Sequence, residues 1–296
     1  MSKPKRKKRH VLRNVLIILI IILALCYAYN QAHLDENISM PEDVSFEVYF
    51  IDVGQGDSAF IVCDGRAMLI DGGSNEQSQK VYSFLESRGI KHLDYIVASH
   101  ADADHVGGLS AALNYAKVDH ALCTVTSHET VSFTNFVKYL KRQGVEITVP
   151  DAGDTFSLGS AQCTVIGPEK GETYSDNTSL IIRVEYGNTS FLFTGDAEYS
   201  DEQAALESGL ELKSTVLKVG HHGSSSSSSY YFLQAVQPRY AVISVAADND
   251  YGHPTERVLG RLDEVNAEVL RTDELGDILC RSDGENVKFT ALKNEG

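Results

Sequence analysis

Basic residues are scarce in most of this chain, which carries 26 Lys and Arg residues against 41 Asp and Glu residues. Seven of the basic residues precede Asp35, the first acidic residue, and they leave 19 basic against 41 acidic side chains, a net charge of −22 for the remainder. A body this acidic is not expected to hold nucleic-acid phosphates on a broad basic surface. If the substrate is a polyanion, we expect bound metal ions to supply the attraction.

Cysteine is also rare, with five residues in 296. One of them, Cys26, lies in an apolar run, and the other four are far apart within strand-like segments: Cys63, Cys123, Cys163 and Cys280. This spacing does not indicate a disulfide framework, so we interpret these four as small core residues.

Only one long apolar run is present, at residues 15–29, and it extends back to residue 11 with Arg13 and Asn14 as its polar interruptions. A helix of about 20 residues spans the hydrocarbon of a bilayer. We therefore predict a single transmembrane helix at residues 11–30 that anchors the chain to the cell membrane. The basic tail, residues 1–10, predicts a cytoplasmic N-terminus with the remainder extracellular. A cleaved signal peptide is the alternative, but no convincing small-residue cleavage site follows the run.

Residues 31–43 are polar and form a predicted linker, so the folded domain is expected at residues 44–296. Alternation of period two and helical spacing predicts a β-rich start followed by βαβ units, and then a second half built in the same way. The expected helices are residues 76–88, 109–116, 130–142, 198–206, 231–236 and 255–265. The chain closes with a predicted β-hairpin. Two such halves predict an α/β (α+β) fold of two sheets packed face to face with helices outside, a four-layer αββα sandwich.

Four potential metal ligands lie within six positions, directly after the predicted strand at residues 93–99: His100, Asp102, Asp104 and His105. Imidazole and carboxylate groups bind borderline divalent cations, and alternate positions of an extended turn point to one side. The alternative is an acidic helix start, in which Asp102 or Asp104 caps the next helix and the histidines are surface residues.

Three later strand ends carry further candidates, namely Asp196, the pair His221 and His222, and His253. Loops at one sheet edge can converge, and a carboxylate between two cations can bridge them in a two-metal centre. Simpler interpretations exist for two of these residues, because Asp196 could cap a helix and His253 could be an ordinary loop histidine.

These segments resemble known motifs. The run HADADHVGG is similar to the HxHxDH motif of the metallo-β-lactamase superfamily, with Asp102 in place of the second His. A closer resemblance is to the hydrolase domain of ComEC-type competence proteins, and it covers residues 46–288. It is carried, in order, by FIDVGQGDS, LIDGG, SHADADHVGG, NTSL, FLFTGDAE, LKVGHHGSSSSS, AVISV and YGHP. The resemblance implies the αββα metallo-β-lactamase fold and a hydrolase that acts on phosphodiester bonds, with DNA the substrate usually proposed.

Carried over residue by residue, the resemblance implies a set of metal ligands: His100, Asp102, Asp104, His105, Asp196 as the bridging carboxylate, and a last His. Strand order favours His253 as that last ligand, with His221 or His222 as a site residue above the metals. The implied ions are two divalent cations, Zn²⁺ or Mn²⁺. Asp104 is expected to orient the attacking hydroxide, and His221 or His222 to protonate the leaving oxygen. Further motif residues are expected to support the ligands or contact substrate: Asp52, Gln55, Asp57, Asp71, Asn177 and Lys218.

The resulting prediction is a membrane-anchored, extracellular, metal-dependent hydrolase, a phosphodiesterase or nuclease related to competence DNA uptake. Two alternatives stay open. Asp102 replaces one His, and Asn177 stands where another might belong, which is consistent with a catalytically weak or non-enzymatic anchored domain. The fold also hosts hydrolases of other ester or amide bonds.

Overall fold

The computed structural model describes residues 44–168 and 178–292. The predicted basic tail, membrane segment and linker, as well as Asn177, lie outside these residues. Within the described ranges, no helix has both the length and the apolar character needed to cross a membrane. The ranges belong to one compact unit, Pro41–Gly296.

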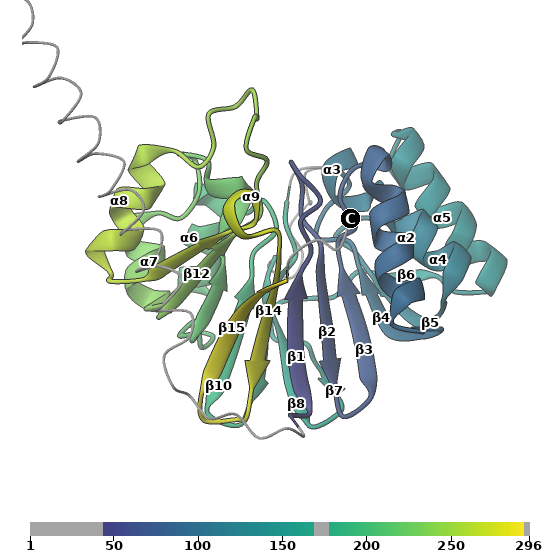
Figure 1. Cartoon of the computed structure of the whole chain (residues 1–296), viewed down its shortest axis with the longest axis horizontal. Coiled ribbons are helices and arrows are strands. Elements are labelled where there is room, and N and C mark those ends of the chain that lie inside the picture. Colours follow the sequence, from purple (N-terminus) through teal and green to yellow (C-terminus); the bar gives the residue numbers. More distant parts are fainter. Residues whose placement is uncertain (1–43, 169–177, 293–296) are drawn as a thin grey trace, which may run out of the picture. The chain divides into compact units, whose positions relative to one another are not determined.

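The first sheet has eight strands in the order β15-β14-β1-β2-β3-β4-β5-β6 (Figure 1). They are β1 (Phe46–Phe50), β2 (Ala59–Cys63), β3 (Arg66–Ile70), β4 (His92–Val97), β5 (Lys117–Leu122), β6 (Ile147–Thr148), β14 (Asp277–Ser282) and β15 (Val287–Leu292). Strands β3 to β6 run parallel, whereas the others pair antiparallel. The closing hairpin therefore adds to the sheet built by the first half of the chain.

The second sheet has seven strands in the order β13-β12-β11-β10-β9-β8-β7. They are β7 (Thr155–Leu158), β8 (Ala161–Gly167), β9 (Ile181–Tyr186), β10 (Thr189–Phe193), β11 (Val216–Lys218), β12 (Tyr240–Ile243) and β13 (Glu268–Arg271). Strands β10 to β13 are parallel, and β7 to β10 are antiparallel. Each sheet thus has a parallel part whose carboxyl ends can carry loops to a common edge.

Helices cover the outer face of each sheet (Figure 1). The first sheet is covered by α2 (Ser78–Ser87), α4 (Leu109–Tyr115) and α5 (Val131–Gln143), and the second by α6 (Tyr199–Glu207), α7 (Tyr230–Val236) and α8 (Glu256–Glu264). Short helical turns η1 (Asn75–Gln77), α3 (Ala103–Val106), η2 (Gly220–Gly223) and α9 (Thr272–Leu275) lie in the connections. A separate apolar core fills the space under each helical layer.

Aromatic rings join the inner faces of the two sheets. The ring centroids of Phe46 and Phe191 lie 5.0 Å apart, and those of Phe50 and Phe193 lie 6.1 Å apart. All four side chains are buried. Because these pairs connect β1 with β10, the sheets face each other and the predicted two-sheet α/β architecture is confirmed.

Helix α5 shows how the sequence sets an element. Thr130 precedes it and accepts a hydrogen bond from the backbone N–H of Phe133, and Gly144 ends it in the left-handed conformation at φ 74°. Between them, Phe133, Phe136 and Leu140 are buried on one face. The predicted range of 130–142 is therefore close to the observed helix, because both ends carry local capping signals.

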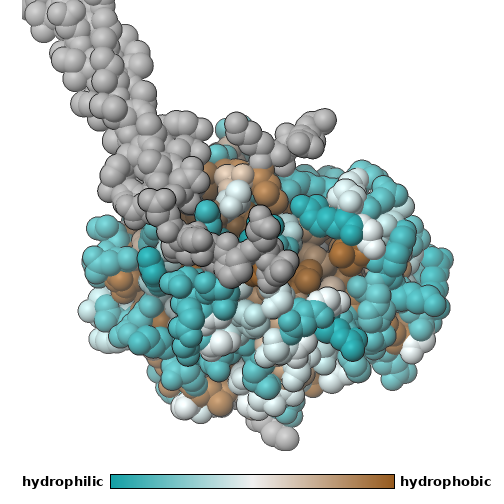
Figure 2. All heavy atoms as spheres, turned by 60° about the horizontal axis from the view of Figure 1, so that its bottom comes forward, coloured by the Kyte–Doolittle hydropathy of each residue, from teal (hydrophilic) through white to brown (hydrophobic). Residues whose placement is uncertain are grey.

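Hydrophilic residues predominate on the face shown in Figure 2, with apolar residues scattered among them. The largest apolar side chains of the described residues are instead buried between the sheets and beneath the helices.

Glycine is required where the loop after β3 meets the loop after β4. The N–H of Gly72 donates to the carbonyl oxygen of His105 at 2.7 Å, and the N–H of Gly108 donates to that of Gly73 at 3.1 Å. A Cβ on Gly108 would fall against the carbonyl oxygen of Gly72, well inside van der Waals contact. Separating these two backbone segments would break their hydrogen bonds, so the close contact between them fixes the position of the His100–His105 segment.

We predict that Gly108→Ala destabilises the protein by about 1–3 kcal/mol, because the added methyl group overpacks two backbone segments. Gly260→Ala is the matched control: Gly260 lies inside α8, and a Cβ there would meet no atom within 4 Å. That change should stabilise the helix by about 1 kcal/mol. Urea unfolding in the presence of a chelator measures both, and equal effects of the two substitutions would contradict the packing argument.

Candidate metal centre

The His100–His105 segment follows β4 and enters α3. Its histidines are buried, whereas the side chains of Asp102 and Asp104 are 48% and 37% exposed. Asp102 occupies the position before α3, yet its side chain makes no capping hydrogen bond. Its Oδ2 lies 3.6 Å from Nε2 of His100 instead. The helix-capping interpretation of Asp102 is therefore not supported.

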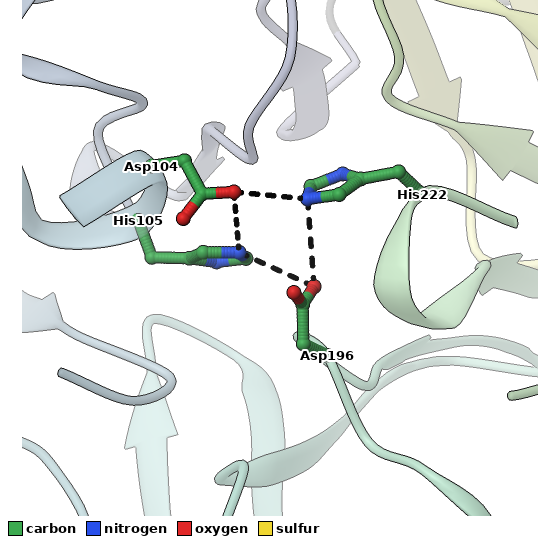
Figure 3. A group of neighbouring side chains, drawn as sticks. All are labelled: Asp104, His105, Asp196 and His222. Atoms are coloured by element: carbon green, nitrogen blue, oxygen red, sulfur yellow. Dashed lines mark ion pairs between the residues drawn. The ribbon is translucent and has the colours of Figure 1, made fainter. Parts of the chain in front are cut away.

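Four side chains from three loops converge on one point (Figure 3). Asp104 and His105 come from α3, Asp196 follows β10, and His222 lies in η2 after β11. Nε2 of His105 lies 3.2 Å from Oδ1 of Asp196, and Nε2 of His222 lies 3.6 Å from the same oxygen. Oδ2 of Asp104 lies 3.4 Å from Nε2 of His222. Two imidazoles and two carboxylates of this kind suit a divalent cation.

The second carboxylate oxygen of Asp196 faces two further histidines. Its Oδ2 lies 4.0 Å from Nε2 of His100 and 3.7 Å from Nε2 of His221. Asp196 thus stands between two pairs of imidazoles, each pair facing a different oxygen. Since α6 is preceded by Glu198, Asp196 does not occupy the capping position that the simpler interpretation gave it.

All four of these histidines share one arrangement. Each Nδ1 has a partner outside the group, so each Nε2 faces Asp196. The partners are Ser99 Oγ for His100 at 3.0 Å, Asp71 Oδ2 for His105 at 3.0 Å, Glu198 Oε1 for His221 at 3.2 Å and the carbonyl oxygen of Ser244 for His222 at 3.0 Å. Carboxylate and carbonyl acceptors require an Nδ1–H donor, so in the neutral form of such a ring Nε2 carries the free lone pair.

Three buried atoms at this point have no hydrogen-bond partner: Nε2 of His105, Nε2 of His222 and Oδ1 of Asp196. They lie at ion-pair distances from one another but without hydrogen-bonding geometry. A buried polar atom without a partner costs roughly 1–3 kcal/mol. Convergence of three such atoms fits a divalent cation, which would accept a lone pair from each.

The charges around this point stabilise one another. Burial lowers the pKa of His222, but the Asp196, Asp104 and Asp57 carboxylates outweigh burial and raise it to about 9. Burial likewise opposes ionisation of Asp57, whereas Lys218 and His222 lower its pKa to about 2. Without a metal, His222 is therefore protonated at neutral pH, and an incoming cation must displace that proton.

Residues beneath the ligands were among those expected to support them. Asp57 Oδ1 lies 3.3 Å from Nδ1 of His222, and its Oδ2 pairs with Nζ of the buried Lys218 at 2.7 Å. Asp71 is also buried and accepts a hydrogen bond from the backbone N–H of Ser99 at 2.8 Å through Oδ1. These groups contact ligand side chains or their loops rather than open surface.

Asp52 and Gln55 occupy the loop after β1. Asp52 Oδ2 lies 3.8 Å from Nζ of Lys80, and Oε1 of Gln55 accepts from the backbone N–H of Ala246 at 3.4 Å. Asp52 thus connects its loop to α2, and Gln55 connects it to the loop after β12. Asn177, the remaining expected residue, lies outside the described ranges.

The structure brings His222, and not His253, into the group drawn in Figure 3. The ring of His253 lies beside that of His221, with centroids 5.7 Å apart and planes at 76°. Strand order favoured His253 because it follows a later strand, but its ring contacts that of His221 and is not part of the four-residue group. The turn η2 instead bends sharply enough to bring both His221 and His222 to Asp196.

That bend has an unusual backbone. His221 has φ 49° and ψ 45°, and His222 has φ 53° and ψ 22°, so two consecutive non-glycine residues adopt the left-handed conformation. Each such residue costs on the order of 1–3 kcal/mol, and such strain clusters at functional sites. The N–H of His221 donates to the carbonyl oxygen of Gly195 at 3.1 Å, and the N–H of Ser224 donates to that of His221 at 2.8 Å.

The serine run after this turn holds it in place. Ser227 Oγ donates to the carbonyl oxygen of Gly220 at 2.7 Å. Glu202 accepts from the backbone N–H groups of Ser228 and Ser229, and Arg261 donates to the carbonyl oxygens of Ser227 and Ser228. An anion on the N–H groups and a cation on the carbonyl groups fix the run from two sides.

Glu198 and Ser226 also belong to the site, although neither was predicted from the sequence. Oγ of Ser226 donates to Oε1 of Glu198 at 2.7 Å, the same oxygen that lies 3.2 Å from Nδ1 of His221. Glu198 stands two residues after Asp196 in FLFTGDAE, directly before a helix, where an acidic residue has an ordinary role. Only the fold brings it to His221.

Comparison with known proteins decides the family. Residues 51–247 match the model of the metallo-beta-lactamase superfamily. The chain belongs to that superfamily. It is 34% identical over 254 residues to ComE operon protein 3 of Bacillus subtilis (strain 168), which covers 79% of this chain and 33% of the relative. It is 32% identical over 286 residues to Recombination protein 2 of Haemophilus influenzae, covering 94% of this chain and 33% of the relative. The resemblance to ComEC-type competence proteins is confirmed.

This superfamily member spans about a third of the length of these curated relatives. Among solved structures, it is similar to the metallo-beta-lactamase fold protein YhfI from Bacillus subtilis, with a TM-score of 0.53 and 12% identity over 83% of this chain and 100% of that one. CmlA, a diiron beta-hydroxylase from Streptomyces venezuelae, gives a TM-score of 0.53 at 16% identity over 82% of this chain and 55% of that one. At these identities the likeness shows the fold. The chain therefore has a metal-dependent hydrolase fold with candidate metal-binding residues.

We predict that Asp71→Asn weakens divalent-metal binding by about 10- to 100-fold, the usual effect of losing a carboxylate behind a histidine ligand. Asn tolerates the left-handed backbone at this position, where φ is 58°, and its oxygen can still accept from Ser99 N–H. Its NH₂ group would then face Nδ1 of His105 as a second donor. This disfavours the tautomer with a proton on Nδ1, which leaves Nε2 free to bind the metal. Titration calorimetry with Zn²⁺ and Mn²⁺ measures the change.

The control for this prediction is Asp263→Asn, which removes an exposed carboxylate from α8. Its metal affinity should equal that of the unsubstituted protein. Unchanged affinity in Asp71→Asn, with the fold intact by circular dichroism, would show that this carboxylate does not support a ligand.

Proposed function

We propose that the protein is a metal-dependent phosphodiesterase and that its substrate is a nucleic-acid strand, a substrate class consistent with its similarity to competence and recombination proteins. The observation that carries the proposal is the arrangement of His100, His105, His221 and His222, whose Nε2 atoms all face Asp196 while each Nδ1 is held by a separate partner. Such a group fits two cations, one on each side of a shared carboxylate.

The proposed cofactors are two divalent ions, Zn²⁺ or Mn²⁺. Asp104, His105, Asp196 and His222 would hold one of them, and His100, Asp102 and Asp196 belong to the other side. If His221 serves as a proton donor and not as a ligand, the second side offers one imidazole, that of His100, and two carboxylates, which favours a harder ion such as Mn²⁺ there. When bound, such ions lower the pKa of water and polarise the group under attack.

Asp104 is the proposed residue that orients the attacking water. Its carboxylate is partly exposed, 3.4 Å from Nε2 of His222 and 3.9 Å from Nε2 of His105. An acceptor at this position can hold the water proton and direct the oxygen lone pair toward phosphorus. A carboxamide cannot accept that proton, and it also binds cations more weakly.

His221 is the proposed proton donor to the leaving oxygen. It is more exposed than the buried His222, with a side chain that is 33% accessible, and it lies outside the four-residue group. Glu198 lies against its Nδ1 and Ser226 holds Glu198. In its protonated form the ring would carry N–H groups on both nitrogens, with Nδ1–H held by Glu198 and Nε2–H facing the reaction site, as a general acid requires.

The anchored, extracellular placement is part of the proposal and is supported by the basic residues 1–10 and the apolar run that follows. Under it, the basic tail stays in the cytoplasm, residues 11–30 cross the membrane, 31–43 form the linker, and the hydrolase domain of residues 44–296 faces outward. External protease should digest the domain on intact cells while a tag on the N-terminus survives. Protection of the domain would reverse the orientation.

We predict that Asp104→Asn lowers turnover of bis-p-nitrophenyl phosphate and of DNA by several orders of magnitude, because it removes both a ligand and the water acceptor. The purified protein is assayed with Mn²⁺ or Zn²⁺ after metal analysis. Asp119→Asn is the matched control, since Asp119 also pairs with a histidine, His92 at 3.0 Å, in an exposed group elsewhere. Its activity should be unchanged.

The outcomes also separate the alternatives. A protein that binds no metal and hydrolyses nothing would indicate a non-enzymatic anchored domain. Metal binding with cleavage of carboxylic esters or lactams, but of no phosphodiester, would retain the hydrolase and replace the substrate.

We predict that His221→Ala reduces cleavage of an alkyl phosphodiester by about 10²- to 10⁴-fold, the usual contribution of a general acid. The loss should be much smaller for a p-nitrophenyl ester, because p-nitrophenolate leaves without a proton. The ratio of the two losses is the measurement. Equal losses for both substrates would exclude the acid role, and an effect confined to metal content would identify His221 as a ligand.

A further inference from the structure

The loop between β12 and α8 rises at the same end of the sheets as α3 and α9 (Figure 1). One side chain organises it. Nδ2 of Asn249 donates to the carbonyl oxygens of Ala246 and His253 at 2.8 and 2.7 Å, and Oδ1 accepts from the N–H groups of His253 and Tyr251 at 2.9 and 3.2 Å. Four hydrogen bonds from one amide hold this loop in a defined shape.

The loop presents a series of rings that leads away from the metal centre. His221, whose Nε2 lies 3.7 Å from Asp196, is in edge contact with His253. The ring of Tyr251 is stacked on His253, with centroids 5.7 Å apart and planes at 24°. Tyr251 is 71% exposed. An aromatic ring this exposed, in a loop this ordered, is available to a ligand at the edge of the proposed reaction site.

The loop offers little to a phosphate group. Asp248 and Asp250 flank the rings and are exposed. They repel an anion, and the chain beyond its N-terminal tail is strongly acidic. A flat ring without charge can instead bind a nucleobase, because base–aromatic stacking needs no cation. The base faces of a duplex are occupied by their neighbours, so this mode requires a single strand.

We propose that Tyr251 and His253 form a stacking platform for a nucleobase of a single-stranded nucleic acid, next to the phosphodiester at the metal centre. The proposal rests on the proposed function and assigns its substrate as single-stranded. It also gives His253 a role that does not require metal ligation. The platform acts in binding, so it is tested apart from turnover.

Binding of a fluorescein-labelled single-stranded oligodeoxynucleotide to the full chain, in detergent and with a chelator present, is measured by anisotropy. Tyr251→Ala should weaken binding by about 5- to 150-fold, the range for loss of one stacked base. Tyr251→Phe keeps the ring and should bind as the unsubstituted protein does. Tyr231→Ala is the matched control, since Tyr231 is 70% exposed but lies on α7 against Tyr230.

An abasic oligomer of equal length separates stacking from charge. The seven basic residues of the tail can bind phosphates, and the abasic strand reports that component alone. The unsubstituted protein should bind the abasic strand with the same affinity that Tyr251→Ala has for the base-bearing strand. Equal binding of abasic and base-bearing strands by the unsubstituted protein, or unchanged affinity in Tyr251→Ala, would overturn the proposal.

His253→Phe distinguishes stacking from ligation. This change keeps a flat ring and removes both nitrogen atoms, so strand binding and metal content should both be retained. Loss of a bound ion would assign His253 to the metal centre and overturn its part in the platform. Because strand binding is measured without metal, a protein that stacks bases but cleaves no phosphodiester would refute the proposed function and leave the platform intact.

Discussion

The structure depends on a single buried carboxylate that is shared by two sets of imidazoles. Asp196 faces His105 and His222 through one oxygen and His100 and His221 through the other. Burial of these groups is unfavourable unless charge and hydrogen bonding are compensated. The local architecture supplies that compensation: Asp71 lies behind His105, Asp57 and Lys218 lie behind His222, and the Ser99 hydroxyl and the Glu198 carboxylate lie behind the other two imidazoles. The polar network is thus built in layers around the carboxylate.

Backbone strain is concentrated at the same place. The left-handed pair His221–His222 is stable only because the serine run behind it is fixed by Glu202 and Arg261, and because Gly195 accepts its N–H. Glu202 is itself buried, and burial raises its pKa to about 6 even though the serine N–H groups oppose that shift. A turn of two histidines in this conformation exposes both Nε2 atoms to Asp196, which a regular helix or strand could not do.

Much of this could be predicted from sequence because the signals were local. The strand-to-loop position of His100–His105, the caps of α5 and the closing hairpin follow from periodicity and turn residues. The strand β5 begins at Lys117, and its first four positions are mostly exposed, so its start carries no apolar run in the sequence. Strands β7 and β13 are short edge strands with polar side chains, and such strands carry only a weak alternating pattern in the sequence. The presence of His222 in the four-residue group could not be predicted from the sequence for a different reason. It depends on the left-handed backbone of His221 and His222, which the residue types in HHG do not predict. Glu198 was missed because its contact with His221 joins residues 23 positions apart in the chain.

The four-residue group draws its members from both halves of the chain, with Asp104 and His105 from the first sheet and Asp196 and His222 from the second. The described cysteines are free and buried, so these halves share no covalent bond between side chains. A cation held by all four groups would close a loop of roughly a hundred residues, and so restrict the unfolded chain much as a disulfide does. Ligand binding to the native state alone also stabilises it by mass action. Metal supply would then govern the persistence of the fold as well as its chemistry, and a metal-starved cell would lose the protein by unfolding and proteolysis.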